Sequence, residues 1–180
     1  PHIDVGRMLR EESAKKTSAG LKIKKYMDEG ELIPHDLVIE IIKKIIFADV
    51  CRNGFILDGF PRTKHEAEVL DGLAKVDKVI LLEVDDKTAV ERLSKRVQCN
   101  KCGAIYGISI LPKKKGICDN CGGRLVTRAD DAPDPIKKRL KIYHREITQV
   151  ILHYKHLLER VDASLPVDVV FEQIVKLSGK

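Results

Sequence analysis

The chain has 180 residues, of which 43% are hydrophobic and 33% are charged, and its formal net charge is +6. This composition supports one substantial core and excludes a disordered chain, and no apolar run approaches the ~20 residues of a membrane helix, so a soluble, cytoplasmic protein without membrane partners is expected. Nucleic acid is a disfavoured partner, because the four Phe and four Tyr are not interleaved with basic stretches and the chain has no Trp.

Helices are expected along the first quarter of the chain. The patterns predict helices over residues 8–16 and 21–29, with Gly20 and Gly30 as the breaks on either side of the second. A third helix follows Pro34, since helices favour proline at their first position, and its apolar residues recur at helical spacing.

Two continuous apolar runs, at residues 55–57 and 79–82, predict strands that are buried on both faces of a parallel sheet. A helix over residues 63–73 separates them, so the order strand, helix, strand predicts an α/β architecture with helices on both sheet faces. Cys51, ahead of the first run, is interpreted as a small hydrophobic residue packed at a helix end.

The second half of the chain continues the alternation of helices and strands. Helices are predicted over residues 88–97, 135–158 and 167–177, and a last strand over residues 159–162. The sequence contains no internal repeat or long linker, so subdomains are expected as insertions into one α/β body.

Four of the five cysteines form two pairs, Cys99-x-x-Cys102 and Cys118-x-x-Cys121, with fifteen residues between the pairs. This spacing is typical of two short knuckles that deliver four thiolates to one tetrahedral zinc. A structural zinc site is favoured, and an iron–sulfur cluster and a redox dithiol are the alternatives. A catalytic zinc is disfavoured, because four cysteines leave no open coordination position for water.

Glycines accompany both cysteine pairs. Gly103, Gly122 and Gly123 are expected to supply the positive backbone angles that such knuckles require. Between the pairs lie short β-prone pieces, including Tyr106 and Ile108, that are too small to form a core of their own. A metal ion would replace that core.

A further motif, Asp58-Gly59-Phe60-Pro61-Arg62, directly follows the first predicted strand, where α/β proteins place ligand contacts. Gly59 permits a close backbone approach, Pro61 stiffens the turn, and Arg62 can donate two hydrogen bonds to one phosphate.

The run from Gly54 to Thr63, GFILDGFPRT, resembles the signature of adenylate kinases, and the chain is identified as a member of that family. The four cysteines are similar to those in the zinc-containing lids of the family. Further segments that resemble it are GRMLR at 6–10, DEGELIP at 28–34, ERLSKR at 91–96, TRADD at 127–131 and KRL at 138–140.

The resemblance implies an α/β fold of the P-loop nucleoside monophosphate kinase type, with three layers around a parallel sheet and a small β-rich zinc lid. A core domain is expected at residues 1–17, 50–95 and 128–180. A helical monophosphate-binding domain is expected at residues 18–49, and the zinc lid at residues 96–127.

The implied activity is reversible phosphoryl transfer between ATP and AMP, giving two ADP, by a monomer that uses Mg²⁺ with ATP. Such transfer depends on positive charge around the phosphate oxygens and on the exclusion of water by a closing lid. By resemblance, Arg92 would stack on the adenine of ATP and Asp58 would organise magnesium through water. Arg96, Arg128 and Arg139 would clamp the phosphates, Arg96 as part of the ATP site. The AMP site would comprise Gly6, Arg10, Ile33, Gly59, Arg62 and Glu66.

The printed sequence departs from the family in lacking the phosphate loop G-x-x-x-x-G-K-[ST]. In the family this loop and the first strand precede the position of Pro1. The expectation is therefore a truncated chain that is inactive by itself, and the alternative is a pseudoenzyme or a partner that lends the strand.

Other departures concern the acceptor and the lid. Glu66 stands where the family has a Gln that reads the adenine edge, and residues 4–7 read DVGR in place of STGD. AMP is the leading acceptor, and GMP is the alternative because an ionised carboxylate accepts but does not donate hydrogen bonds. Val97 replaces an Arg common at the lid entrance. Asp130-Asp131 either pairs with arginines or caps a helix.

For the chain as a whole, the non-enzymatic alternative is a zinc ribbon that binds nucleic acid.

Overall fold

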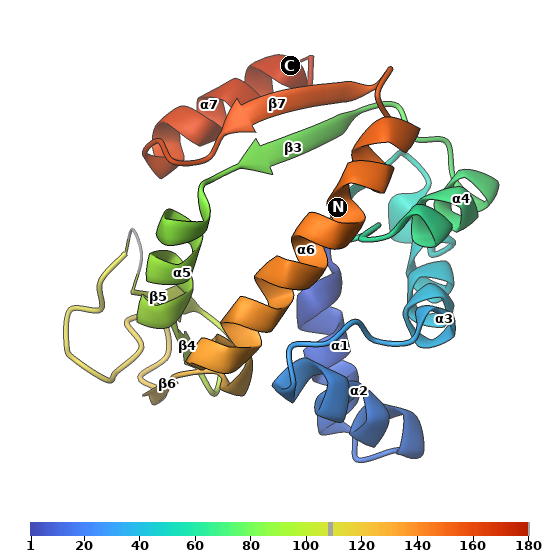
Figure 1. Cartoon of the computed structure of the whole chain (residues 1–180). Coiled ribbons are helices and arrows are strands. Elements are labelled where there is room, and N and C mark those ends of the chain that lie inside the picture. The colour runs from blue at the N-terminus through green and yellow to red at the C-terminus, as the bar shows by residue number, and fades with distance from the viewer. Residues whose placement is uncertain (108–109, 180) are drawn as a thin grey trace. The chain divides into compact units, whose positions relative to one another are not determined.

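The structure is a computed structural model that describes residues 1–107 and 110–179, so Ile108 of the cysteine-rich segment lies outside the described residues. The chain divides into two compact units. The first comprises Pro1–Asp77 with Lys141–Leu157, and the second comprises Lys78–Leu140 with Leu158–Lys180. Figure 1 shows the helices and strands of each unit.

The first unit contains a two-stranded parallel sheet, in which Ile3 of β1 lies opposite Leu57 of β2. Buried side chains of the sheet and helices, among them Ile23 and Ile42, form its core. The elements are β1 (His2–Asp4), α1 (Val5–Ala14), α2 (Ser18–Asp28), α3 (His35–Ile46), a 3₁₀ turn (Asp49–Cys51), β2 (Ile56–Asp58) and α4 (Lys64–Leu73). Cys51 is buried at the end of the 3₁₀ turn, as expected.

Side-chain caps begin three of these helices. The Asp4 carboxylate accepts the backbone N–H of Arg7 at 2.9 Å, and the Thr17 hydroxyl accepts that of Gly20 at 3.0 Å. The Thr63 hydroxyl accepts the N–H of Glu66 in the same way. Each cap satisfies a backbone donor that has no partner within its helix.

The predicted helix break at Gly20 is wrong, because Gly20 lies inside α2. A Cβ atom at this position would stand 2.6 Å from the carbonyl oxygen of Glu12 in α1. The glycine therefore allows close packing of two helices, and the Thr17 cap sets the helix start.

The second unit contains a parallel pair and a small antiparallel sheet. Strands β3 and β7 pair from Val79 opposite Leu158 to Glu83 opposite Asp162, and β4 lies between β5 and β6. The elements are β3 (Val79–Glu83), α5 (Asp86–Lys95), β4 (Val97–Cys99), β5 (Ile105–Tyr106), β6 (Leu125–Val126), a 3₁₀ turn (Ala129–Asp131), β7 (Leu158–Asp162) and α7 (Val167–Leu177). The predicted parallel arrangement of strands and the predicted last helix are confirmed.

The helix α6 (Pro133–His153) ends earlier than predicted. Beyond it the chain turns, with the N–H of Leu157 bonded to the carbonyl of Tyr154. Tyr154 is buried in the first unit, where its hydroxyl donates to the carbonyl of Ala67 at 3.2 Å and to the carboxylate of Asp71 at 2.9 Å. Packing of this tyrosine, rather than helical periodicity, accounts for the apolar pattern past residue 153.

The expectation that both apolar strands are buried on both faces is wrong. Ile56 of β2 is 66% exposed and Leu82 of β3 is 47% exposed. Among the described residues each parallel sheet has only two strands, and such a narrow sheet leaves part of its surface uncovered.

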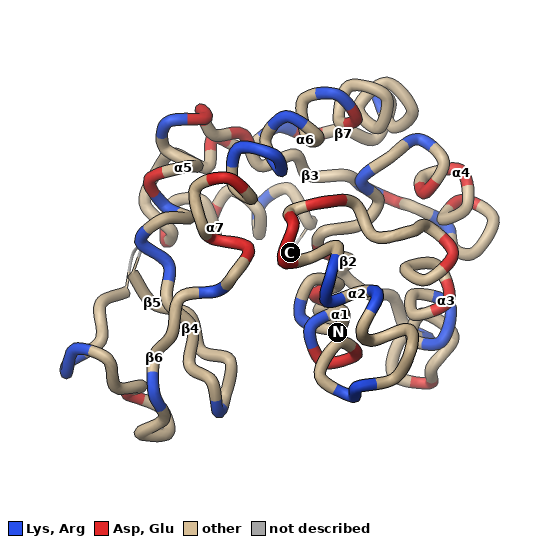
Figure 2. The backbone as a smooth tube through the Cα atoms, turned by 60° about the horizontal axis from the view of Figure 1, so that its bottom comes forward, with Lys and Arg blue, Asp and Glu red and all other residues tan. Residues whose placement is uncertain are grey.

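Charges are distributed differently along two of the helices. Figure 2 shows Lys and Arg interspersed with Asp and Glu along α5, whereas α4 carries one Lys at its start and then only acidic residues. In residues 1–107 and 110–179, no helix combines the length and the apolarity needed to cross a membrane.

Candidate functional site

Arg96 and Asp131 form a buried ion pair in the second unit. Nε of Arg96 donates to Oδ2 of Asp131 at 2.8 Å, and Nη2 donates to Oδ1 at 2.5 Å. The Asp131 side chain is fully buried and that of Arg96 is 14% exposed. Two parallel hydrogen bonds fix the guanidinium plane as well as its position.

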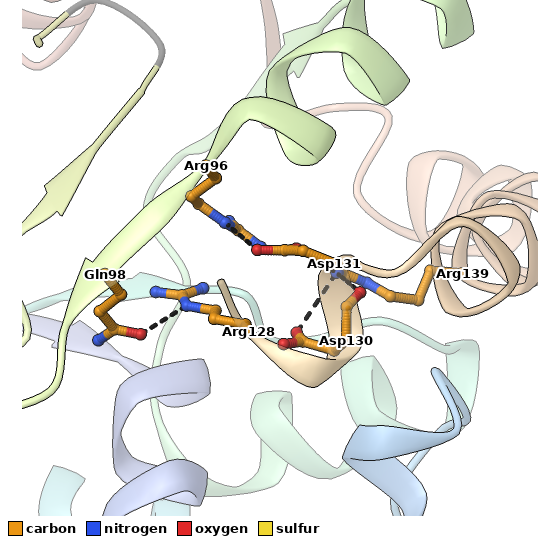
Figure 3. Close-up of polar contacts among 6 residues, drawn as sticks. All are labelled: Arg96, Gln98, Arg128, Asp130, Asp131 and Arg139. Carbon is orange, nitrogen blue, oxygen red and sulfur yellow. Dashed lines mark hydrogen bonds and ion pairs between the residues drawn. The ribbon is translucent and has the colours of Figure 1, made fainter. Parts of the chain in front are cut away.

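Two further arginines lie beside this pair (Figure 3). Nη1 of Arg139, from α6, is 3.6 Å from Oδ1 of Asp131 and donates to the carbonyl of Asp130 at 3.2 Å. Nε of Arg128 donates to Oε1 of Gln98 at 2.5 Å. Three guanidinium groups thus accompany two carboxylates, which leaves an excess of positive charge suited to an anion.

The structure decides between the two interpretations of Asp130-Asp131. Both carboxylates pair with arginines, Asp131 with Arg96 and Asp130 with Arg139 at 3.4 Å. Sequence reasoning missed Gln98 as the partner of Arg128. Its only signal was its position one residue before a cysteine knuckle.

Arg92 lines a pocket of about 350 Å³ between α5 and the turn before α7. Its Nη1 donates to the carbonyl of Ala163 at 2.6 Å and its Nη2 to that of Ser164 at 3.1 Å. The other lining residues include Thr88, Lys95, Leu165 and Pro166. A guanidinium held flat by two carbonyls is suited to stacking on an aromatic ring.

The turn at Ser164 was missed from the sequence, although its position carries a signal. It follows β7 at the carboxyl end of a parallel strand, where α/β proteins bind ligands.

In the first unit, two arginines lie over glycines. Nε of Arg62 donates to the carbonyl of Gly59 at 2.8 Å, and a Cβ at Gly59 would stand 3.3 Å from Nη2. A Cβ at Gly6 would stand 3.3 Å from Nη1 of Arg10. Gly59 has a φ of +79°, a conformation that favours glycine. Both glycines therefore bring a guanidinium close to the backbone.

Glu66 is 3% exposed and binds two other segments of the first unit. Its Oε2 accepts the backbone N–H of Arg62 at 2.7 Å, and its Oε1 is 3.1 Å from Nδ1 of His35. His35 was missed from the sequence, where its only signal is its place beside Ile33 and Pro34. The carboxylate therefore joins the Arg62 loop to the start of α3.

The remaining expected residues of this unit differ in exposure. Ile33 is buried in the core. Asp58 ends β2 with an exposed carboxylate that lies 3.2 Å from Nε2 of His2. An exposed carboxylate at a strand end is accessible to a hydrated cation.

The four paired cysteines converge in the second unit, with all sulfur atoms within 4.8 Å of one another. Sγ of Cys99 is 3.5 Å from that of Cys121, and Sγ of Cys102 is 3.5 Å from that of Cys118. Disulfide sulfurs lie about 2.05 Å apart, so these thiols are not bridged. Together they can hold one metal ion.

The crowded thiols affect one another's protonation. Burial raises the pKa of Cys118, but hydrogen bonds from the Tyr106 hydroxyl and the following backbone outweigh this effect and lower the pKa to about 6. The Ala104 N–H lowers the pKa of Cys102, whereas the adjacent thiols of Cys121 and Cys118 raise it to about 12. Four thiolates at this spacing therefore need a cation between them.

The role expected for the knuckle glycines is confirmed at two of three positions. Gly103 has a φ of +75° and Gly122 a φ of +70°, whereas Gly123 has no positive φ. A Cβ at Gly123 would stand 2.8 Å from Sγ of Cys99 and 3.3 Å from Sγ of Cys121. Gly123 is required by the close approach of the sulfurs instead.

Comparison with known proteins agrees with these features. A family model described as "Adenylate kinase" matches residues 1–158. A protein named "Adenylate kinase" from Caldicellulosiruptor saccharolyticus is 46% identical over 162 residues, which cover 87% of this chain and 75% of the relative. Proteins of the same name are 41% identical in Clostridium acetobutylicum, over 100% of this chain and 87% of the relative, and 44% identical in Methanocella arvoryzae, over 94% and 82%.

Proposed function

Because the chain belongs to the adenylate kinase family, we propose that it catalyses reversible phosphoryl transfer between ATP and AMP, giving two ADP. The observation that carries the proposal is the gathering of Arg96, Arg128 and Arg139 around Asp130 and Asp131. Phosphoryl transfer relies on positioning and on positive charge held around the phosphate oxygens, and guanidinium groups fixed by carboxylates supply both.

In this proposal the second unit supplies the donor side. Arg92 stacks on the adenine of ATP in the pocket beside Ser164, where two carbonyls hold its guanidinium. Arg96 belongs to both the ATP site and the phosphate clamp. Mg²⁺ travels with ATP, and Asp58, exposed at the end of β2, orients its waters.

The first unit supplies the acceptor side. Arg10 and Arg62, each against a glycine backbone at Gly6 and Gly59, bind the AMP phosphate. Ile33 lies near the base, and Glu66 completes the site. GMP is not favoured as the acceptor, because the relatives are named adenylate kinase and the Glu66 carboxylate already engages Arg62 and His35.

The metal held by Cys99, Cys102, Cys118 and Cys121 is proposed to be zinc. Zinc–thiolate bonds of about 2.3 Å in a tetrahedron separate the sulfurs by about 3.8 Å. The sulfur separations of 3.5 Å, with all four sulfurs within 4.8 Å, fit this geometry. The ion would stabilise a lid at residues 96–127, inserted in a core at residues 1–17, 50–95 and 128–180, with AMP held by residues 18–49. A cytoplasmic monomer is part of the same proposal.

The test uses the full-length natural protein with ATP, AMP and Mg²⁺, and follows ADP formation by ³¹P NMR. We expect faster phosphoryl transfer to AMP, giving two ADP, than to GMP, giving ADP and GDP. In Arg139→Ala we expect kcat to fall by about 10²-fold or more. Arg160→Ala is the matched control, because Arg160 is an exposed arginine of the same unit that pairs with Glu83. A folded wild-type protein that forms no ADP would overturn the proposal.

A further inference from the structure

Tyr106 lies beside the four cysteines without being one of the ligands. It is 4% exposed and packs in a small cluster with Cys99, Cys118 and Leu125. Its hydroxyl oxygen is 3.6 Å from Sγ of Cys118 and accepts the backbone N–H of Asp119 at 2.9 Å. A buried phenol therefore contacts a ligand sulfur and the residue that follows it.

These two contacts determine the direction of the hydrogen bond to sulfur. The Asp119 N–H occupies an acceptor position of the phenolic oxygen, so the hydroxyl hydrogen is left to point elsewhere. A metal-bound thiolate carries no hydrogen and can only accept. The hydroxyl of Tyr106 is consequently the donor and Cys118 the acceptor.

We propose that Tyr106 is a positioning residue of the metal centre, whose hydroxyl donates to the Cys118 thiolate and slows loss of the metal. The inference rests on the proposed zinc site. Four thiolates give a Zn²⁺ centre a net charge of −2, and a donor to one sulfur disperses part of that charge. At Cys99 the N–H groups of Lys101 and Cys102, 3.4 and 3.5 Å from the sulfur, have the same effect.

The same hydroxyl joins distant parts of the cysteine-rich segment. Tyr106 belongs to β5, whereas Asp119 lies within the second cysteine pair. The Asp119 carboxylate in turn accepts the N–H of Lys113 at 3.0 Å. Removal of the hydroxyl would therefore loosen Cys118 directly, through its sulfur, and indirectly, through Asp119. Because both contacts depend on one side-chain hydroxyl, a single substitution deletes them.

The test compares full-length wild type with Tyr106→Phe, and uses Tyr26→Phe in α2 of the other unit as the matched control. Zinc content is measured first, followed by the rate of zinc transfer to a chromogenic chelator. We expect about tenfold faster release from Tyr106→Phe, as is usual for loss of a ligand's hydrogen-bond partner, and no change in the control.

A spectroscopic readout separates this role from packing. In the Co²⁺-substituted protein, loss of the donor should move the sulfur-to-cobalt charge-transfer band to lower energy. Global incorporation of 3-fluorotyrosine, a stronger donor, should move the band to higher energy, and this measurement does not require Tyr106→Phe to fold. Packing changes alone would not give shifts of opposite sign.

The outcomes distinguish the two proposals. Wild type without zinc would overturn the zinc site and this inference together. If wild type binds zinc, but Tyr106→Phe releases it at the wild-type rate and neither Tyr106→Phe nor 3-fluorotyrosine shifts the cobalt band, the role of Tyr106 is overturned and the zinc site stands. Zinc binding with the expected shifts but without ADP formation would overturn only the kinase function.

Discussion

The carboxylate of Asp131 binds the guanidinium of Arg96 across 35 residues of sequence. The pair links the end of α5, just before the first cysteine pair, to the turn just after β6. Asp131 also lies 3.6 Å from Nη1 of Arg139, so one buried carboxylate orients two guanidinium groups. An anion that binds these arginines would find them already positioned, which reduces the cost of ordering them.

Asp131→Ala should therefore be severely destabilising. Removal of one partner leaves the guanidinium of Arg96 buried without its counter-ion, and we expect the free energy of unfolding to fall by about 3 kcal/mol in urea titrations. Glu40→Ala is the control, because Glu40 and Lys44 form an exposed pair on α3 and such pairs contribute little. Equal midpoints for the two variants would contradict the importance of the buried pair.

Arg92→Lys should weaken ATP binding selectively. A lysine cannot reproduce the flat guanidinium held by the carbonyls of Ala163 and Ser164, so we expect the KM for ATP to rise about tenfold with little change in kcat. Steady-state kinetics at saturating AMP measure both constants. Arg160→Lys, on the exposed surface of β7, should leave them unchanged. An unaltered KM in Arg92→Lys would show that the pocket is not the donor site.

Two substitutions at Glu66 distinguish the hydrogen bond that its side chain accepts from the charge that it carries. Glu66→Leu leaves the N–H of Arg62 without its acceptor, so the free energy of unfolding should fall by about 2 kcal/mol and the KM for AMP should rise. Glu66→Gln keeps an acceptor for Arg62 and should retain most of both properties. If the Leu variant matched wild type in urea titration and in KM, the positioning of the Arg62 loop would not depend on Glu66.

Gly20 and Gly72 form a matched pair of helical glycines with opposite expected effects. Gly20→Ala would force a Cβ against the Glu12 carbonyl and should lower the free energy of unfolding by about 2 kcal/mol. Gly72→Ala meets nothing within 4 Å and should raise it by about 0.5–1 kcal/mol, because alanine restricts the unfolded chain and favours the helix. Thermal unfolding of both variants checks the signs, and a stabilising Gly20→Ala would refute the close packing of α1 and α2.

Gly123→Ala should release the metal. The added Cβ would stand 2.8 Å from Sγ of Cys99, and the displacement needed to relieve this contact exceeds the ~0.2 Å tolerance of metal–ligand distances. Gly116→Ala is the control in the same segment, since its φ of +78° also strains alanine but no atom lies within 4 Å. Zinc content after dialysis should fall in Gly123→Ala alone, and equal loss from both would indicate backbone strain instead.

Features carried by local patterns were predictable from the sequence. The spacing of the cysteine pairs predicted the convergence of four sulfurs, because two-residue gaps constrain both members of each pair. The helix α7 was predicted at its observed bounds, and the order of strand and helix predicted parallel strands, although not which strands pair. The roles of Arg62, Arg128 and the other expected site residues stay predictions until activity is measured.

Only the tertiary structure decided which groups meet. The contact of Arg92 with Ala163 spans 71 residues, and that of Glu66 with His35 spans 31. Gly20 looked like a helix break and Gly123 like a turn glycine, yet both are required by atoms from other segments. A residue's neighbours along the chain determine its backbone preference, whereas its packing partners depend on how complete elements pack, which no single stretch of sequence encodes.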